Sequence, residues 1–207
     1  MSSQIKGKFI VLEGVDGAGK STQARLLYQF LKKERKKVFL TSEPTRGPIG
    51  KIFRLFLEKQ EKLSALGLQL LFCADRAYHL ERIVLPLLKK GYYVISDRYF
   101  FSTIAYGLLE IKDFHWLCQL NKNFILPDIT FLLDLSEKEA LKRVQERIGK
   151  KRRNFSIFEK EKILKAIRRN YLFLQKKFPR IFLIDGQKPI PEVFEQIKKF
   201  FEKGRDS

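Results

Sequence analysis

A glycine-rich loop ending in Lys-Ser follows the first apolar run of the chain, Phe9–Glu13. Residues 14–21 read Gly-Val-Asp-Gly-Ala-Gly-Lys-Ser and match the spacing G-x-x-x-x-G-K-[ST]. Glycines let the backbone turn tightly enough for its N–H groups to face phosphate oxygens, and the positive end of a following helix adds to that field. The spacing predicts a triphosphate-binding loop, with Lys20 on the β- and γ-phosphates of ATP and the Ser21 hydroxyl on Mg²⁺. The residues expected around the phosphates are Gly14, Val15, Asp16, Gly17, Ala18, Gly19, Lys20, Ser21 and Thr22.

The alternative for this loop is a glycine-rich turn with a coincidental lysine, which the strand–loop–helix context disfavours. A second candidate group is Asp97, which follows the apolar run Tyr93–Ser96. A carboxylate there can hold a magnesium-bound water beside the phosphate loop. An N-cap of the next helix is equally consistent with its position.

The elements that would position these groups alternate along the chain. Short apolar runs rich in β-branched and aromatic residues lack strict alternation, as strands covered on both faces do. Strands alternating with helices predict a parallel sheet with right-handed crossovers, so we expect one three-layer α/β domain, 1–207, with a five-stranded sheet and the P-loop NTPase fold. The predicted strands are Phe9–Glu13, Val38–Ser42, Tyr93–Ser96, Ile129–Leu135 and Ile181–Ile184. The predicted helices are Ser21–Glu34, Ile49–Glu58, Leu63–Lys89, Phe114–Asn121, Ser136–Arg147, Phe158–Lys177 and Pro191–Lys203.

The composition limits the classes of partner. The formal net charge is +19, which is consistent either with nucleic-acid binding or with a solvated basic surface around a site for anionic nucleotides. The basic runs are scattered and carry no RNA-binding aromatic signature, so we favour the second interpretation. No apolar run is long enough to span a bilayer, and the first eight residues lack an apolar signal core, so a cytoplasmic protein is expected.

Several segments, in order, resemble the thymidylate kinase (dTMP kinase) family of P-loop nucleoside monophosphate kinases. They are Val11–Gln23, Ser42-Glu43-Pro44-Thr45, Leu71–Leu80, Asp97-Arg98-Tyr99 with the following Ser102 to Tyr106, and Leu126–Asp134. The resemblance runs along nearly the whole chain. It implies ATP-dependent phosphorylation of dTMP to dTDP, ATP and Mg²⁺ as cofactors, and a homodimer, for which the helical region Leu63–Lys89 is the natural interface.

The resemblance also implies roles on the acceptor side. Phe72 and Arg76 share a helix face because they are four residues apart, so the ring would stack on a pyrimidine while the guanidinium donates to its carbonyl edge. Arg98 would clamp the dTMP phosphate, because a forked donor suits phosphate. Thr103 would bond the base edge, Asp16 would lie near the acceptor phosphate or the 3′-hydroxyl, and Tyr106 would pack on C2′ of the sugar. The alternative for the pair is a core Phe72 with an exposed Arg76, and ordinary core packing is the alternative for Tyr106.

The chain departs from the family pattern in its lid, about 147–157. The pair Phe158-Glu159 follows Ser156-Ile157, where many members have Asp-Arg. Charge on the transferred phosphoryl group must still be neutralised, so Arg152 or Arg153 is expected to close over the phosphates, with Arg147 in reserve. A disordered basic loop is the alternative.

Arg143 would stack on adenine, and the loop 185–189 would read the purine edge or simply connect two elements. Gly17 replaces an Arg found in one branch, and Gly107 stands where members often have Gln.

Three rival functions remain open from the sequence. The acceptor could be another nucleotide, such as dUMP, UMP or CMP, or a deoxynucleoside. The net charge of +19 leaves a nucleic-acid-binding P-loop NTPase as a second rival, and the altered lid suggests a regulatory paralogue without turnover as a third.

Overall fold

The computed structural model describes residues 7–59, 63–148 and 157–203. At its centre lies a five-stranded sheet in the order β2-β3-β1-β4-β5, and every adjacent pair of strands is parallel. The predicted α/β class and parallel sheet are therefore confirmed, with strand ends within a residue of those expected. The strands are β1 (Lys8–Glu13), β2 (Val38–Ser42), β3 (Tyr93–Asp97), β4 (Ile129–Asp134) and β5 (Ile181–Asp185).

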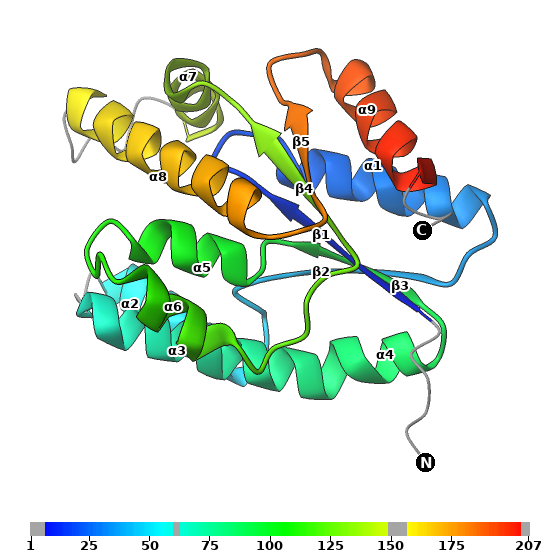
Figure 1. Ribbon diagram of the computed structural model, residues 1–207, viewed down its shortest axis with the longest axis horizontal. Coiled ribbons are helices and arrows are strands. Elements are labelled where there is room, and N and C mark those ends of the chain that lie inside the picture. The colour runs from blue at the N-terminus through cyan, green and yellow to red at the C-terminus, as the bar shows by residue number, and fades with distance from the viewer. Residues whose placement is uncertain (1–6, 60–62, 149–156, 204–207) are drawn as a thin grey trace.

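Helices cover both faces of the sheet (Figure 1). Helices α1 and α9 pack together on one face, while α4 and α8 pack on the other with α5 beside α8. This cover explains why β1, from Phe9 to Leu12, is at most 1% exposed and apolar throughout. The helices are α1 (Lys20–Lys33), α2 (Pro48–Lys59), α3 (Ala65–His79), α4 (Leu85–Lys89), α5 (Phe100–Gly107), α6 (Phe114–Asn121), α7 (Glu137–Ile148), α8 (Ile157–Lys177) and α9 (Ile190–Lys203).

One helix was missed by the sequence patterns. Helix α5 has seven buried residues among its eight, so it has no polar face and shows no amphipathic period for a pattern to detect. This helix carries Thr103 and Tyr106 and begins two residues after Arg98.

The long helix predicted over Leu63–Lys89 is corrected in two respects. It begins at Ala65, because the Ser64 hydroxyl accepts a hydrogen bond from the N–H of Gly67 at 3.1 Å and caps the helix. It is also interrupted by the π-helical segment η1 (Leu80–Val84) before it continues as α4. None of the helices in the described ranges is both long and apolar enough to cross a membrane.

The predicted lid lies largely outside the described residues. Helices α7 and α8 flank it, and Arg152 and Arg153 fall in the undescribed segment 149–156. Arg147 belongs to α7, but its side chain is also outside the description.

Candidate functional site

The glycine-rich loop lies between the carboxyl end of β1 and the start of α1. Its glycines Gly14, Gly17 and Gly19 have φ angles of 142°, 88° and 92°, a region that L side chains rarely adopt. A Cβ on Gly14 would also lie 2.6 Å from the Leu133 carbonyl oxygen. Nothing lies within 4 Å of a Cβ built on Gly19, so open space adjoins the helix start where an anion would sit.

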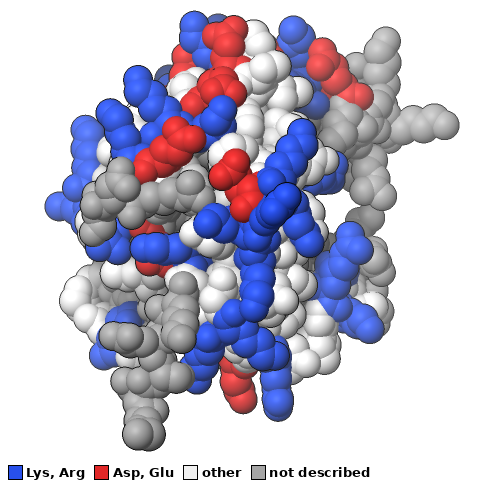
Figure 2. Space-filling view, turned by 90° about the vertical axis from the view of Figure 1, so that its right-hand side faces the viewer, with Lys and Arg blue, Asp and Glu red and all other residues white. Residues whose placement is uncertain are grey.

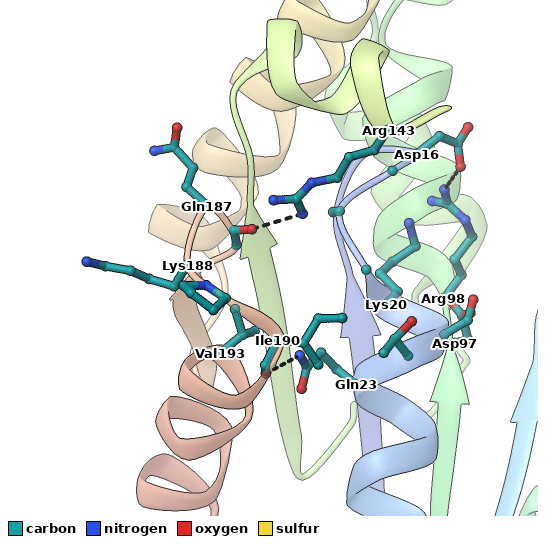
Figure 3. A pocket seen from close by; sticks show the side chains of 17 residues that line it. Asp16, Lys20, Gln23, Asp97, Arg98, Arg143, Gln187, Lys188, Ile190 and Val193 are labelled. Carbon is teal, nitrogen blue, oxygen red and sulfur yellow. Dashed lines mark hydrogen bonds and ion pairs between the residues drawn. The ribbon is translucent and has the colours of Figure 1, made fainter. Parts of the chain in front are cut away.

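A cleft of about 630 Å³ opens beside this loop (Figure 3). Arg143 reaches into it from α7, and its Nη1 donates to the Gly186 carbonyl oxygen at 3.1 Å. On the opposite wall Gln23, only 2% exposed, donates from Nε2 to the Ile190 carbonyl oxygen at 3.0 Å. The cleft volume is within the range of nucleotide-sized sites. Its lining comprises Asp16, Gly17, Ala18, Gly19, Lys20, Ser21, Thr22, Gln23, Asp97, Arg98, Arg143, Gly186, Gln187, Lys188, Pro189, Ile190 and Val193.

The Lys20 ammonium is bound by the loop's own backbone. Its Nζ donates to the carbonyl oxygens of Gly14 at 3.0 Å and Val15 at 2.9 Å. Burial and the charge of Arg98 lower the pKa of Lys20 to about 8, although Asp16 and other carboxylates oppose the shift. An incoming phosphate would supply the negative charge that this buried cation lacks.

Ser21 and Asp97 are brought together across the loop. The Ser21 hydroxyl donates to Oδ2 of Asp97, at the end of β3. The N-cap position of α5 is occupied by Tyr99, so the N-cap alternative for Asp97 is wrong. A hydroxyl beside a carboxylate is a hard oxygen set that suits Mg²⁺. Among the described residues no group of three or more His, Cys, Asp or Glu could hold a metal, so phosphates and water would have to complete the shell of a magnesium ion there.

Arg98 lies where the cleft meets α5. Its backbone is left-handed, with φ 76°, and its Nη2 pairs with Asp16 Oδ1 at 2.6 Å (Figure 3). Its Nη1 donates to Ser102 Oγ at 2.7 Å and to the Tyr171 hydroxyl at 3.1 Å. Burial alone would lower the pKa of Arg98, but Tyr171, Tyr106 and Asp16 hold that pKa above its ordinary value. The guanidinium is therefore a permanent, oriented cation at the inner end of the cleft.

The electrostatics of Asp16 depend on the same cation. Burial raises the pKa of the Asp16 carboxyl, but the charges of Arg98 and Lys20 outweigh it and hold that pKa below the ordinary value. Asp16 is thus a carboxylate in the ligand-free protein and neutralises Arg98, with which it forms an ion pair.

Glu13 is a residue beside the site to which sequence reasoning assigned no role. Its carboxyl group is buried at the end of β1 and accepts from the N–H of Tyr99 at 2.9 Å and from Ser102 Oγ at 2.5 Å. The Tyr171 hydroxyl of α8 donates to it at 3.1 Å. Glu13 therefore joins β1, α5 and α8 behind Arg98. The sequence could have pointed to Glu13, because a glutamate at the end of an apolar strand is a recognisable signal. No sequence feature marked Tyr171.

The expected base-site residues meet between α3 and α5. Arg76 is 1% exposed, and its guanidinium donates to Thr103 Oγ1 at 2.7 Å and Asn121 Oδ1 at 2.7 Å. It also forms an ion pair with Glu43 at 2.8 Å. Sequence reasoning assigned no role to Glu43 or Asn121, although Glu43 lies in a segment that carried the resemblance.

Two aromatic residues, Phe72 and Tyr106, were also expected on the acceptor side. Phe72 packs on Phe53 of α2, with ring centroids 4.7 Å apart. The Tyr106 hydroxyl lies 3.4 Å from both Arg98 Nη2 and Asp16 Oδ2. Tyr106 thus contacts two residues that line the cleft, Asp16 and Arg98, whereas Phe72, Arg76 and Thr103 do not line the cleft itself.

Basic residues occur in several groups on the face shown in Figure 2, with acidic side chains between some of them. A band of Lys and Arg side chains runs down the middle of this face, and the acidic side chains lie mostly in its upper half (Figure 2).

Comparison with known proteins gives matches along nearly the full length. The sequence model of the thymidylate kinase family matches residues 12–197. A probable thymidylate kinase of Thermococcus kodakarensis is 41% identical over 202 residues, covering 94% of this chain and 97% of the relative. A probable thymidylate kinase of Pyrococcus horikoshii is 40% identical, covering 93% and 95%. A thymidylate kinase of Thermosipho africanus is 37% identical, covering 94% and 98%.

Proposed function

Because this chain belongs to the thymidylate kinase family, we propose that it transfers the γ-phosphate of ATP to dTMP, giving dTDP and ADP. The observation that carries the proposal is the position of Arg98. This cation lies between the phosphate-loop cleft and the cluster on α3 and α5, and it bonds Asp16 and Ser102 at 2.6 and 2.7 Å. A phosphate bound by Arg98 would therefore face a triphosphate in the cleft.

ATP would occupy the cleft with its phosphates on the loop and its base between Arg143 and the loop 186–189. The Lys20 ammonium would exchange its bonds to the loop carbonyls for β- and γ-phosphate oxygens. Ser21 and Asp97 would hold the magnesium ion that accompanies ATP, and this ion would neutralise charge on the phosphate oxygens.

dTMP would bind on the other side of Arg98. Its phosphate would displace Asp16 from the guanidinium, leaving Asp16 near the phosphate or the sugar hydroxyl. Tyr106 would pack on the deoxyribose, and the base would lie against Phe72 with its edge toward Arg76 and Thr103.

The reaction needs no covalent intermediate and no strong general base, because the acceptor oxygen already belongs to an anion. The main task of the protein is to hold two polyanions together and to stabilise the transferring group with oriented cations. Lys20 and Arg98 supply two of them. Arg152 or Arg153 of the proposed lid 147–157 would supply a third and would exclude water when the lid closes.

The test is a coupled ADP-release assay with dTMP, dUMP, UMP, CMP and AMP as acceptors. We expect the highest kcat/KM with dTMP. Lys20→Ala should lose about 10²–10³-fold in kcat while its thermal unfolding stays cooperative. Failure of the wild-type protein to release ADP with any acceptor would contradict the proposal, and preference for UMP or CMP would reassign the substrate.

A homodimer is proposed from the apolar surface of α2 and α3, which pack against each other. Ile52 and Leu55 of α2 are 45% and 50% exposed, and Leu66 and Leu70 of α3 are both 51% exposed. Adjacent exposed apolar side chains of this size favour an interface. Sedimentation equilibrium should give twice the monomer mass, and Leu70→Glu should shift the protein toward monomer.

A further inference from the structure

Gly107 lies beside a glutamine side chain that fills the space a larger residue would need. A Cβ on Gly107 would lie 2.7 Å from Gln69 Nε2 and 3.0 Å from Leu117 Cδ2. The φ of Gly107 is not in the left-handed range, so the backbone does not require glycine at this position. A side chain on residue 107 would therefore have to displace the end of the Gln69 side chain from this space.

Only one of the two polar atoms of the Gln69 side-chain amide has a hydrogen-bond partner among the described residues. Gln69 is 4% exposed, and its Nε2 donates to the Thr103 carbonyl oxygen at 3.3 Å. Its Oε1 is buried and has no hydrogen-bond partner among the described residues. Flipping the amide would not help, because the oxygen would then face the carbonyl of Thr103. A buried acceptor without a partner calls for an explanation, and a bound donor is one.

The position of this amide indicates which bound group would donate a hydrogen bond to its oxygen. Gln69 precedes Phe72 and Arg76 by three and seven residues on α3, so the three side chains share one helix face. Gln69 and Arg76 both donate to Thr103, one to its carbonyl and one to its hydroxyl. The amide therefore belongs to the same hydrogen-bonded cluster as Arg76 and Thr103, two of the groups assigned to the base of the acceptor.

We propose that Gln69 is a specificity-determining residue of the acceptor site, whose amide oxygen accepts a hydrogen bond from the N3–H group of the pyrimidine. This inference rests on the proposed function. Thymine and uracil carry a hydrogen on N3, whereas N3 of cytosine is an acceptor. Gln69 thus favours dTMP and dUMP over dCMP, and the glycine at position 107 makes room for it.

The first test compares wild type with Gln69→Leu, which keeps the volume and removes the amide. The measurement is kcat/KM for dTMP, dUMP and dCMP. We expect dTMP and dUMP to lose about tenfold, mainly through KM, because one hydrogen bond in a buried site is lost. The value for dCMP should stay within about twofold. Equal losses for all three acceptors would mean that Gln69 only supports the packing of α3 on α5, and would overturn the proposal.

The second test supplies the amide from residue 107 instead of residue 69. Its outcome does not depend on whether the Gln69→Leu variant folds. Gln69→Ala opens the space, and Gln69→Ala/Gly107→Gln returns an amide from the opposite helix. The double variant should regain at least half of the lost preference for dTMP over dCMP, and calorimetric ATP binding should match wild type throughout. A double variant no more selective than Gln69→Ala would overturn the proposal. If wild type phosphorylates dTMP and either test fails, the proposed function stands and only the role of Gln69 is refuted. If wild type is inactive on every monophosphate, both the proposed function and the role of Gln69 are refuted.

Discussion

Lys20 should take up a proton when ATP binds. Burial and the neighbouring Arg98 hold the pKa of this ammonium at about 8 in the ligand-free protein. The β- and γ-phosphates would surround it with negative charge and raise its pKa again. A side chain that is partly neutral before binding and fully charged afterwards must draw the difference in protons from the buffer.

The size of the effect follows from the pKa of about 8. The neutral fraction of Lys20 is about 0.1 at pH 7, about 0.5 at pH 8 and about 0.9 at pH 9, and the proton uptake per ATP has the same values. Because only the charged form binds the triphosphate well, the apparent Kd should rise about twofold at pH 8 and about tenfold at pH 9, relative to pH 6.5.

Isothermal titration calorimetry of MgATP at pH 7, 8 and 9, each in two buffers of different ionisation enthalpy, measures this uptake directly. The matched control is Lys20→Arg, whose guanidinium stays charged throughout the range; whatever affinity it retains should be independent of pH, with no uptake. Zero uptake at pH 9 together with a constant Kd for wild type would refute the reasoning, because the ammonium would then be fully charged before ATP arrives.

Three further perturbations test other contacts. Asp97→Asn should raise the Mg²⁺ concentration needed for half-maximal activity at least several-fold, because a carboxylate ligand becomes neutral; an unchanged magnesium titration would remove Asp97 from the metal site. Tyr171→Phe should raise the KM for dTMP about fivefold while the KM for ATP stays constant, since about 1 kcal/mol of hydrogen bonding to Arg98 is lost; equal changes in both KM values would contradict a role specific to the acceptor. Arg143→Ala should weaken ATP binding about fivefold in calorimetry by freeing Gly186 and exposing the base, and an unaltered Kd would place adenine elsewhere.

Local sequence patterns were sufficient for the strands and for the phosphate loop. A strand covered on both faces is apolar along its length, and this signal needs no knowledge of its neighbours. The loop Gly14–Ser21 is likewise specified locally, because its glycines meet the demand for positive φ at 142°, 88° and 92°. Both features depend on residues adjacent in the chain.

The site around Arg98 required the tertiary structure. Glu13, Tyr99 and Tyr171 meet there, although Glu13 and Tyr171 are 158 positions apart in the chain. Helix α5 was missed for a related reason, since burial on all sides erases the polar face by which a helix is recognised.

The sequence by itself therefore determined the class of fold, the position of the glycine-rich loop and the family resemblance, because each is encoded in short-range spacing. Only the tertiary structure decided that Asp97 bonds Ser21 and does not cap a helix, that Arg76 lies buried among Glu43, Thr103 and Asn121, and that Gln69 fills the space beside Gly107. These outcomes depend on how closely separate helices and strands approach, which is fixed by packing the whole core and not by any segment alone.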